Sequence, residues 1–153
     1  MKNVQYGNHL YALKCMSKEL IKKEDIELSV INERQILEKT IFPYIVGYVN
    51  AFHSREHIFI LMEYIHGKEM FDVIREVKTM NLEMVRYYFS CLLVCIEYLH
   101  LNNIVYRDLK PENSVVDYRG RVYLIDMGTA KELKQEEFFK TFTIMGTPHY
   151  MAP

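Results

Sequence analysis

The chain has 153 residues, a length that suits one ordinary domain core. Half of the residues are hydrophobic and a quarter are charged, which excludes an intrinsically disordered chain. The formal net charge of −1 gives no overall attraction to nucleic acid or to an acidic membrane, so we expect neither partner. No apolar run approaches membrane-spanning length, since Glu63 interrupts Ile58–Ile65, and the N-terminus has no apolar signal core.

The three cysteines, Cys15, Cys91 and Cys95, are an odd number without the spacing of a disulfide framework. Cys91 and Cys95 lie one helical turn apart in an apolar run, where we expect buried thiols; a metal-binding pair is the alternative. Free thiols favour a reducing compartment, so we expect a cytoplasmic location.

The side chains of His9–Met16 are expected to point alternately to two faces of a strand, with Leu10, Ala12 and Lys14 on one face. A lysine in a strand is commonly a solvated edge residue, so Lys14 alone indicates little.

Ser17–Lys23 predicts a short polar helix, and Asp25–Lys39 predicts a longer helix. Glu33 lies in the middle of the longer helix, where a glutamate is normally just solvated. The residues expected on the inner side of this helix are Ile26, Val30 and Leu37.

Pro43 separates this helix from two predicted strands, Ile45–Phe52 and His57–Met62, whose short link makes a hairpin plausible. Gly67 is expected to let the chain turn after the second strand. Lys68–Val77 predicts a short helix.

Leu82–His100 is the most strongly predicted helix, with Asn81 as its N-cap. Its apolar stripe is expected to face the core. The stripe consists of Val85, Phe89, Leu92, Leu93, Ile96 and Leu99.

Ile104–Asn113 follows this helix and concentrates basic, acidic and amide side chains, and Pro111 predicts a loop there. Such a loop can hold a hydroxyl nucleophile, a phosphate and a metal ion. Ser114–Asp117 and Arg121–Ile125 predict a small hairpin. Asp126 then begins Asp-Met-Gly, a pattern that is also a common turn.

Three of these segments resemble motifs of eukaryotic protein kinases. Arg107–Asn113 is similar to the catalytic loop H-R-D-L-x-x-x-N, with Tyr106 in the place of His. Tyr-Ala-Leu-Lys, ending at Lys14, resembles the V-A-I-K strand, and Asp126–Gly128 resembles D-F-G with Met in the place of Phe. The amino-acid sequences of these segments are most similar to those of the cyclic-nucleotide-dependent kinases of the AGC group, especially the cGMP-dependent type.

This resemblance implies an α+β, two-lobed kinase-like fold, present only in part, with residues 1–153 forming one partial domain. Residues 1–67 would form a small lobe of antiparallel strands with one main helix, and would end at the hinge. Residues 68–153 would form a mostly helical large lobe, cut short after the activation loop and inside the A-P-E motif. The helix Leu82–His100 would then lose packing partners and expose apolar surface. The phosphate-covering motif G-x-G-x-x-G does not occur.

The resemblance also implies transfer of phosphate from ATP, with Mg²⁺, to Ser or Thr hydroxyls of protein substrates. Asp108 would accept or orient the hydroxyl proton, and Lys110 would neutralise the transferring phosphate. Asn113 and Asp126 would hold Mg²⁺ through oxygen atoms.

For the nucleotide, Lys14 would hold the α- and β-phosphates and would pair with Glu33. Met62–Gly67 would be the hinge, which binds adenine through backbone groups, with Met62 as gatekeeper. The implied contacts to the nucleotide, besides Lys14, are Ala12, Met62, Glu63, Ile65, Glu69 and Val115.

Thr143 matches the regulatory phosphothreonine of the family, so an upstream activating kinase is an implied partner. Arg107 and Lys131 would pair with its phosphate; an ordinary exposed threonine is the alternative. Thr147 matches the residue that contacts the catalytic aspartate and lysine.

Glu69 and Glu112 match acidic residues that bind arginines upstream of the phosphorylated residue, which implies basic substrates; the alternative is that both are merely solvated. Two functions follow from this sequence. The first is a segment of an active serine/threonine kinase, favoured by the joint presence of the polar residues. The second is a catalytically inactive kinase-like scaffold, favoured by the missing glycine-rich motif.

Overall fold

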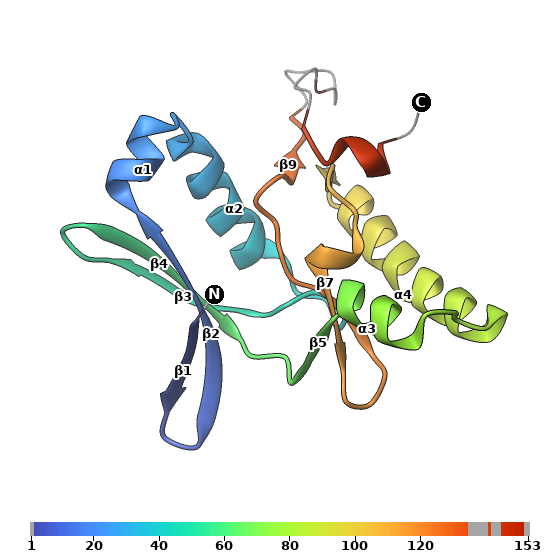
Figure 1. The fold of residues 1–153 in the computed structure, drawn as a ribbon. Coiled ribbons are helices and arrows are strands. Elements are labelled where there is room, and N and C mark those ends of the chain that lie inside the picture. Colours follow the sequence, from blue (N-terminus) through green and yellow to red (C-terminus); the bar gives the residue numbers. More distant parts are fainter. Residues whose placement is uncertain (1, 135–140, 142–144, 152–153) are drawn as a thin grey trace.

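The computed structural model describes residues 2–134, 141 and 145–151, which form two parts joined by the segment after β4 (Figure 1). The first part is an antiparallel sheet with strand order β1-β2-β4-β3 and two helices. Its elements are β1 (Lys2–Tyr6), β2 (His9–Ser17), α1 (Lys18–Lys23), α2 (Glu27–Lys39), β3 (Tyr48–His53) and β4 (His57–Glu63).

The second part contains the long helix α4, a small sheet with strand order β5-β7-β8, and the strand pair β6-β9. In Figure 1, α2 lies between the large sheet and β9. The elements of this part are β5 (Gly67–Glu69), α3 (Met70–Val77), α4 (Leu82–Leu101), β6 (Ile104–Val105), the 3₁₀ helix η1 (Pro111–Asn113), β7 (Ser114–Asp117), β8 (Val122–Leu124), β9 (Lys131–Glu132) and the 3₁₀ helix η3 (Pro148–Tyr150).

The predicted helices and hairpins are present, with three corrections to their starts. The helix expected from Asp25 begins at Glu27, because Asp25 has a positive φ of 53° that cannot continue a helix. As a result Ile26 is exposed rather than inward-facing. The strand expected from Ile45 begins at Tyr48, since Ile45 makes only an isolated bridge to the second part.

Gly67 is needed for a different reason from the one expected. It lies in β5 rather than in a turn, and a Cβ atom there would lie 2.0 Å from the carbonyl oxygen of Val116 in β7. Close approach of two backbones therefore requires the glycine. Because β5 pairs with β7, the helix predicted from Lys68 begins only at Met70.

The helix α4 is capped as predicted, since Asn81 Oδ1 accepts a hydrogen bond of 2.8 Å from the Met84 backbone N–H. Its buried residues are Cys91, Cys95 and Leu99, so the expected buried thiols are confirmed. Burial raises the pKa of the Cys95 thiol to about 12, which keeps it protonated.

The predicted apolar stripe of α4 was partly wrong, because it is wider than the surface that the rest of the chain covers. Leu92 and Ile96 pack against the core, but Val85, Phe89 and Leu93 are 46%, 63% and 55% exposed. The expected exposure of apolar surface on this helix is therefore confirmed.

By length and composition α4 could also cross a membrane, with a mean hydropathy of 1.2. This corrects the expectation that no apolar segment approaches that length, because mean hydropathy tolerates isolated charges such as Arg86 and Glu97. The mostly buried core helix of a soluble domain meets the same criteria, but only 17% of this stretch of α4 is buried, although Cys95 and Leu99 are fully buried against other elements.

The main hydrophobic core runs through both parts of the molecule. It combines residues of α2 and β4 with residues of α4, β6, β8 and the segments beside them. Its members are Ile36, Leu37, Ile45, Val46, Ile60, Met62, Cys95, Leu99, Ile104, Tyr106, Leu124, Met127 and Ala130.

Candidate active site

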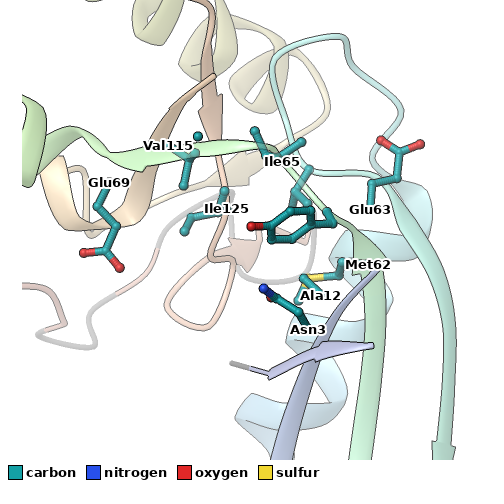
Figure 2. A pocket seen from close by; sticks show the side chains of 11 residues that line it. Asn3, Ala12, Met62, Glu63, Ile65, Glu69, Val115 and Ile125 are labelled. Atoms are coloured by element: carbon teal, nitrogen blue, oxygen red, sulfur yellow. The ribbon is translucent and has the colours of Figure 1, made fainter. Parts of the chain in front are cut away.

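A pocket of about 220 Å³ opens between the large sheet and the β7–β8 hairpin (Figure 2). All six residues expected to contact a nucleotide besides Lys14 line it: Ala12, Met62, Glu63, Ile65, Glu69 and Val115. Tyr64 and Gly67, which belong to the expected hinge, also line it, whereas the sequence analysis missed Asn3, Val46 and Ile125.

The walls of the pocket are mainly apolar, which suits a flat heterocycle. Within the part of the chain that the structure describes, the Ile65 backbone makes no hydrogen bond. Its N–H and C=O groups are therefore available to the hydrogen-bonding edge of a ligand.

Lys14 lies between two carboxylates. Its Nζ is 2.5 Å from Glu33 Oε1 of α2 and 3.2 Å from Asp126 Oδ1, which follows β8. Glu33 is buried, so the solvated alternative is wrong for this residue, and the ion pair implied by the resemblance is present.

The charges of this cluster follow from its burial and contacts. Burial alone would lower the pKa of Lys14, but the Glu33 and Asp126 carboxylates raise it above its usual value. Lys14 is therefore a fixed positive charge. Burial raises the pKa of Glu33, although Lys14 opposes that shift.

Asp108 is held by two side chains of the catalytic loop, Lys110 and Asn113, and by Thr147 from a later segment. The Thr147 hydroxyl donates to Asp108 Oδ1 at 2.7 Å, and Lys110 Nζ lies 2.8 Å from Asp108 Oδ2. Asn113 Nδ2 donates to Asp108 Oδ2 at 3.0 Å and to its backbone oxygen at 2.9 Å. Lys110 also donates to the Thr147 hydroxyl at 2.7 Å.

These contacts keep Asp108 ionised. Burial would raise the pKa of Asp108, but the hydrogen bonds from Lys110, Thr147 and Asn113 lower it below its usual value. An ionised carboxylate held in one orientation can align a hydroxyl group and accept its proton.

One backbone position in the catalytic loop and one in the segment that carries Thr147 have positive φ angles. Arg107 has a φ of 69°, and its Nε donates to the Thr129 carbonyl at 2.6 Å. Gly146 has a φ of 117°, and a Cβ atom there would lie 2.5 Å from the Arg107 carbonyl oxygen. The glycine thus lets the segment that carries Thr147 approach the catalytic loop. The expected loop also contains a 3₁₀ turn, η1, because proline is tolerated at a first helical position.

Two residues of α2 that the sequence analysis missed bind the segment after Asp126. The Ser29 hydroxyl donates to the Gly128 carbonyl at 3.0 Å, and Asn32 Nδ2 donates to the Ala130 carbonyl at 2.6 Å. Together with Glu33 they join α2 to this segment. Polar residues on a helix look solvated in a sequence, so no signal there distinguishes these two.

The two residues that replace the family's usual His and Phe are both buried. Met127 is fully buried in the main core, so it fills an internal slot as expected. Tyr106 is also in that core, and within the described residues its hydroxyl has no hydrogen-bond partner.

The residues implied in regulation and substrate binding are only partly described. Thr143 lies outside the described residues. Lys131 is in β9, paired with Val105 of β6, and Arg107 Nη1 is buried without a partner among the described residues. Glu69 lines the pocket at the end of β5.

The two-part fold, the lysine between two carboxylates and the Asp108 cluster agree with the arrangement that the resemblance to protein kinases implies. The chain belongs to the family described as "Protein kinase domain", which matches residues 2–153.

Several curated proteins are similar to this chain. It is 38% identical to a cGMP-dependent protein kinase of Eimeria tenella and 39% identical to one of Plasmodium berghei (strain Anka), in each case over 94% of this chain. It is 35% identical to a cAMP-dependent protein kinase catalytic subunit of Dictyostelium discoideum, also over 94% of this chain. The chain spans 14%, 16% and 22% of the length of these relatives.

Proposed function

We propose that this chain is the nucleotide-binding and catalytic segment of a serine/threonine protein kinase. It would transfer the γ-phosphate of ATP to Ser or Thr hydroxyls of protein substrates. The observation that carries the proposal is the Asp108 cluster, in which Lys110, Thr147 and Asn113 hold one ionised carboxylate. The nucleotide pocket and the Lys14–Glu33 pair support it.

In this reaction Asp108 accepts the proton of the substrate hydroxyl as the hydroxyl oxygen bonds to the γ-phosphorus. The bond between that phosphorus and the bridging oxygen breaks, and ADP leaves. Lys110 places positive charge beside the transferring phosphate, and Lys14 places it beside the α- and β-phosphates.

The donor atoms present fit Mg²⁺, which prefers oxygen ligands and often uses one or two protein side chains together with substrate phosphates. Asn113 turns its amide nitrogen to Asp108, which leaves its amide oxygen available. Asp126 uses Oδ1 for Lys14 and the Gly128 N–H, which leaves Oδ2 available. Bound Mg²⁺ would neutralise charge on the phosphates.

The test is phosphate transfer from Mg·ATP to a serine peptide with upstream arginines. Asp126→Ala should abolish transfer, whereas Asp72→Ala, at an exposed pair with Arg75, should leave it unchanged. Transfer that survives Asp126→Ala would contradict the proposed metal ligand. A folded chain with no transfer would instead favour the catalytically inactive scaffold.

We also propose that substrates carry basic residues upstream of the phosphorylated hydroxyl. Within the described residues, Glu112 Oε2 is buried without a hydrogen-bond partner, which supports a cationic partner for this carboxylate. Glu69 would be the second acidic contact. A peptide panel without any preference for upstream arginine would contradict this preference.

Regulation is proposed to act through Thr143, phosphorylated by an upstream kinase. Its phosphate would pair with Arg107, whose buried Nη1 supports the role, and with Lys131. Mass spectrometry of the chain purified from its own cells would detect the phosphate.

The free thiols support our proposal of a cytoplasmic location.

A further inference from the structure

Asn3 is a residue of the nucleotide pocket to which the proposed function gives no role. It lies on β1 directly opposite Ala12 of β2, and directly opposite residues of two antiparallel strands share one face of the sheet. Both residues line the pocket. Figure 2 shows the Asn3 amide pointing from β1 into the pocket beside Ala12.

The Asn3 amide differs chemically from the walls around it. The other polar side chains of the lining are Glu63, Tyr64 and Glu69. Glu63 turns its carboxylate away from the pocket centre in Figure 2, Glu69 lies at the opposite end, and Tyr64 makes no hydrogen bond to Asn3 among the described residues. Among the described residues, the Asn3 side chain makes no hydrogen bond and is exposed to solvent. The apolar residues of the walls are Ala12, Val46, Met62, Ile65, Val115 and Ile125.

The arrangement of the walls determines what a bound base offers to Asn3. Asn3 and Ala12 lie on one wall, and Val115 and Ile125 lie on the other (Figure 2). A flat base bound between these walls would turn its hydrogen-bonding edge to the Ile65 backbone and its ring face to Asn3. A ring face accepts only weak hydrogen bonds, so the amide loses water without an equal replacement.

We infer that Asn3 lowers the affinity of this pocket for adenine nucleotides. The inference rests on the proposed function, because it takes ATP as the occupant. An unpaired amide at a partly open site weakens binding by about five- to twentyfold relative to an apolar side chain. Half-saturation of the pocket then requires a higher ATP concentration than in a pocket with an apolar residue at this position.

The test is the dissociation constant of Mg·ATP, measured by calorimetry on the full chain. Asn3→Val should tighten binding by about five- to twentyfold, and valine also suits a strand. Gln5→Val is the matched control, because Gln5 lies on the same strand but donates to the Gly7 carbonyl at 3.0 Å and does not line the pocket. It should leave the dissociation constant unchanged.

Two outcomes would overturn the inference alone. One is an unchanged dissociation constant in Asn3→Val, and the other is weaker binding, which would mean that the amide hydrogen-bonds the nucleotide. If neither the wild type nor Asn3→Val binds Mg·ATP while both are folded by circular dichroism, the nucleotide assignment and this inference both fail. Asn3→Ala provides the same comparison if Asn3→Val does not fold.

Discussion

Replacing Lys14 with methionine should destabilise the fold more than replacing Glu33 with glutamine. Lys14→Met leaves Glu33, whose side chain is only 5% exposed, without its cation. Removing one partner of a buried pair costs about 3–5 kcal/mol in the free energy of unfolding. Glu33→Gln leaves Lys14 with a 23% exposed side chain and with Asp126 at 3.2 Å, so its cost should be about 1–2 kcal/mol.

The loss in the free energy of unfolding caused by Lys14→Met should also depend on pH. Without Lys14, Glu33 loses the interaction that lowers its pKa, so its folded-state pKa rises further above the ordinary value of 4.5. A carboxyl group with a raised folded-state pKa binds its proton more tightly in the folded state, so stability falls as pH rises through that window. Lowering the pH from neutral towards 4.5 should therefore shrink the difference between Lys14→Met and the wild type.

Urea unfolding followed by circular dichroism measures these costs at neutral pH and at about pH 5.5. The double variant should be more stable than the sum of the single costs predicts, by about 1–3 kcal/mol. Lys39→Met, at an exposed pair with Glu132, is the control and should cost about 0–1 kcal/mol. Equal costs for the two single variants, or an additive double variant, would refute the reasoning.

Three further changes test other features. Gly67→Ala should lower the free energy of unfolding by about 2–4 kcal/mol, measured by urea unfolding, because its Cβ atom would lie 2.0 Å from the Val116 oxygen. Phe89→Gln should reduce self-association in light scattering and change stability by less than about 0.5 kcal/mol, since Phe89 is exposed. Asn32→Ala should cost about 1–2 kcal/mol and speed hydrogen exchange after Asp126, because the 2.6 Å bond to Ala130 is lost.

Each of these changes has a neighbouring control. Lys68→Ala tests β5 without a backbone clash, and a similar loss there would contradict the argument for Gly67. Arg86→Gln alters the same helix as Phe89, and an equal fall in scattering would show that the apolar surface is not the cause. Arg34→Ala removes an exposed pair on α2, so hydrogen exchange that rises equally in this variant would argue against the role of Asn32.

The catalytic loop could be predicted from sequence because its side-chain types limit its chemistry. Asp108, Lys110 and Asn113 lie within one short segment, so local geometry alone keeps them close. Lys14 and Glu33 are 19 residues apart in different elements, and only the family resemblance indicated that they would pair.

Other features depend on partners that a sequence does not identify. The apolar stripe of α4 predicted a helix correctly, but periodicity does not reveal how much of a helix surface is covered, and Phe89 stayed exposed. Strand β1 went unpredicted although Val4 and Tyr6 alternate with Asn3 and Gln5, because this alternation spans only four residues, and none of the strand's residues is buried. Asn3 was missed with it. The polar contacts of Ser29 and Asn32 went unpredicted because their acceptors are backbone carbonyls about 100 residues away.

The main core joins Ile60 and Met62 of the first part to Leu99 and Leu124 of the second, and it therefore determines how the molecule unfolds. A chain cut after Gly67 would expose the inner faces of both pieces to water, so neither piece retains enough buried apolar surface to fold alone. The Met62–Gly67 segment that joins the two parts is therefore no boundary for folding. Denaturation should proceed in one cooperative transition, with both lobes melting together.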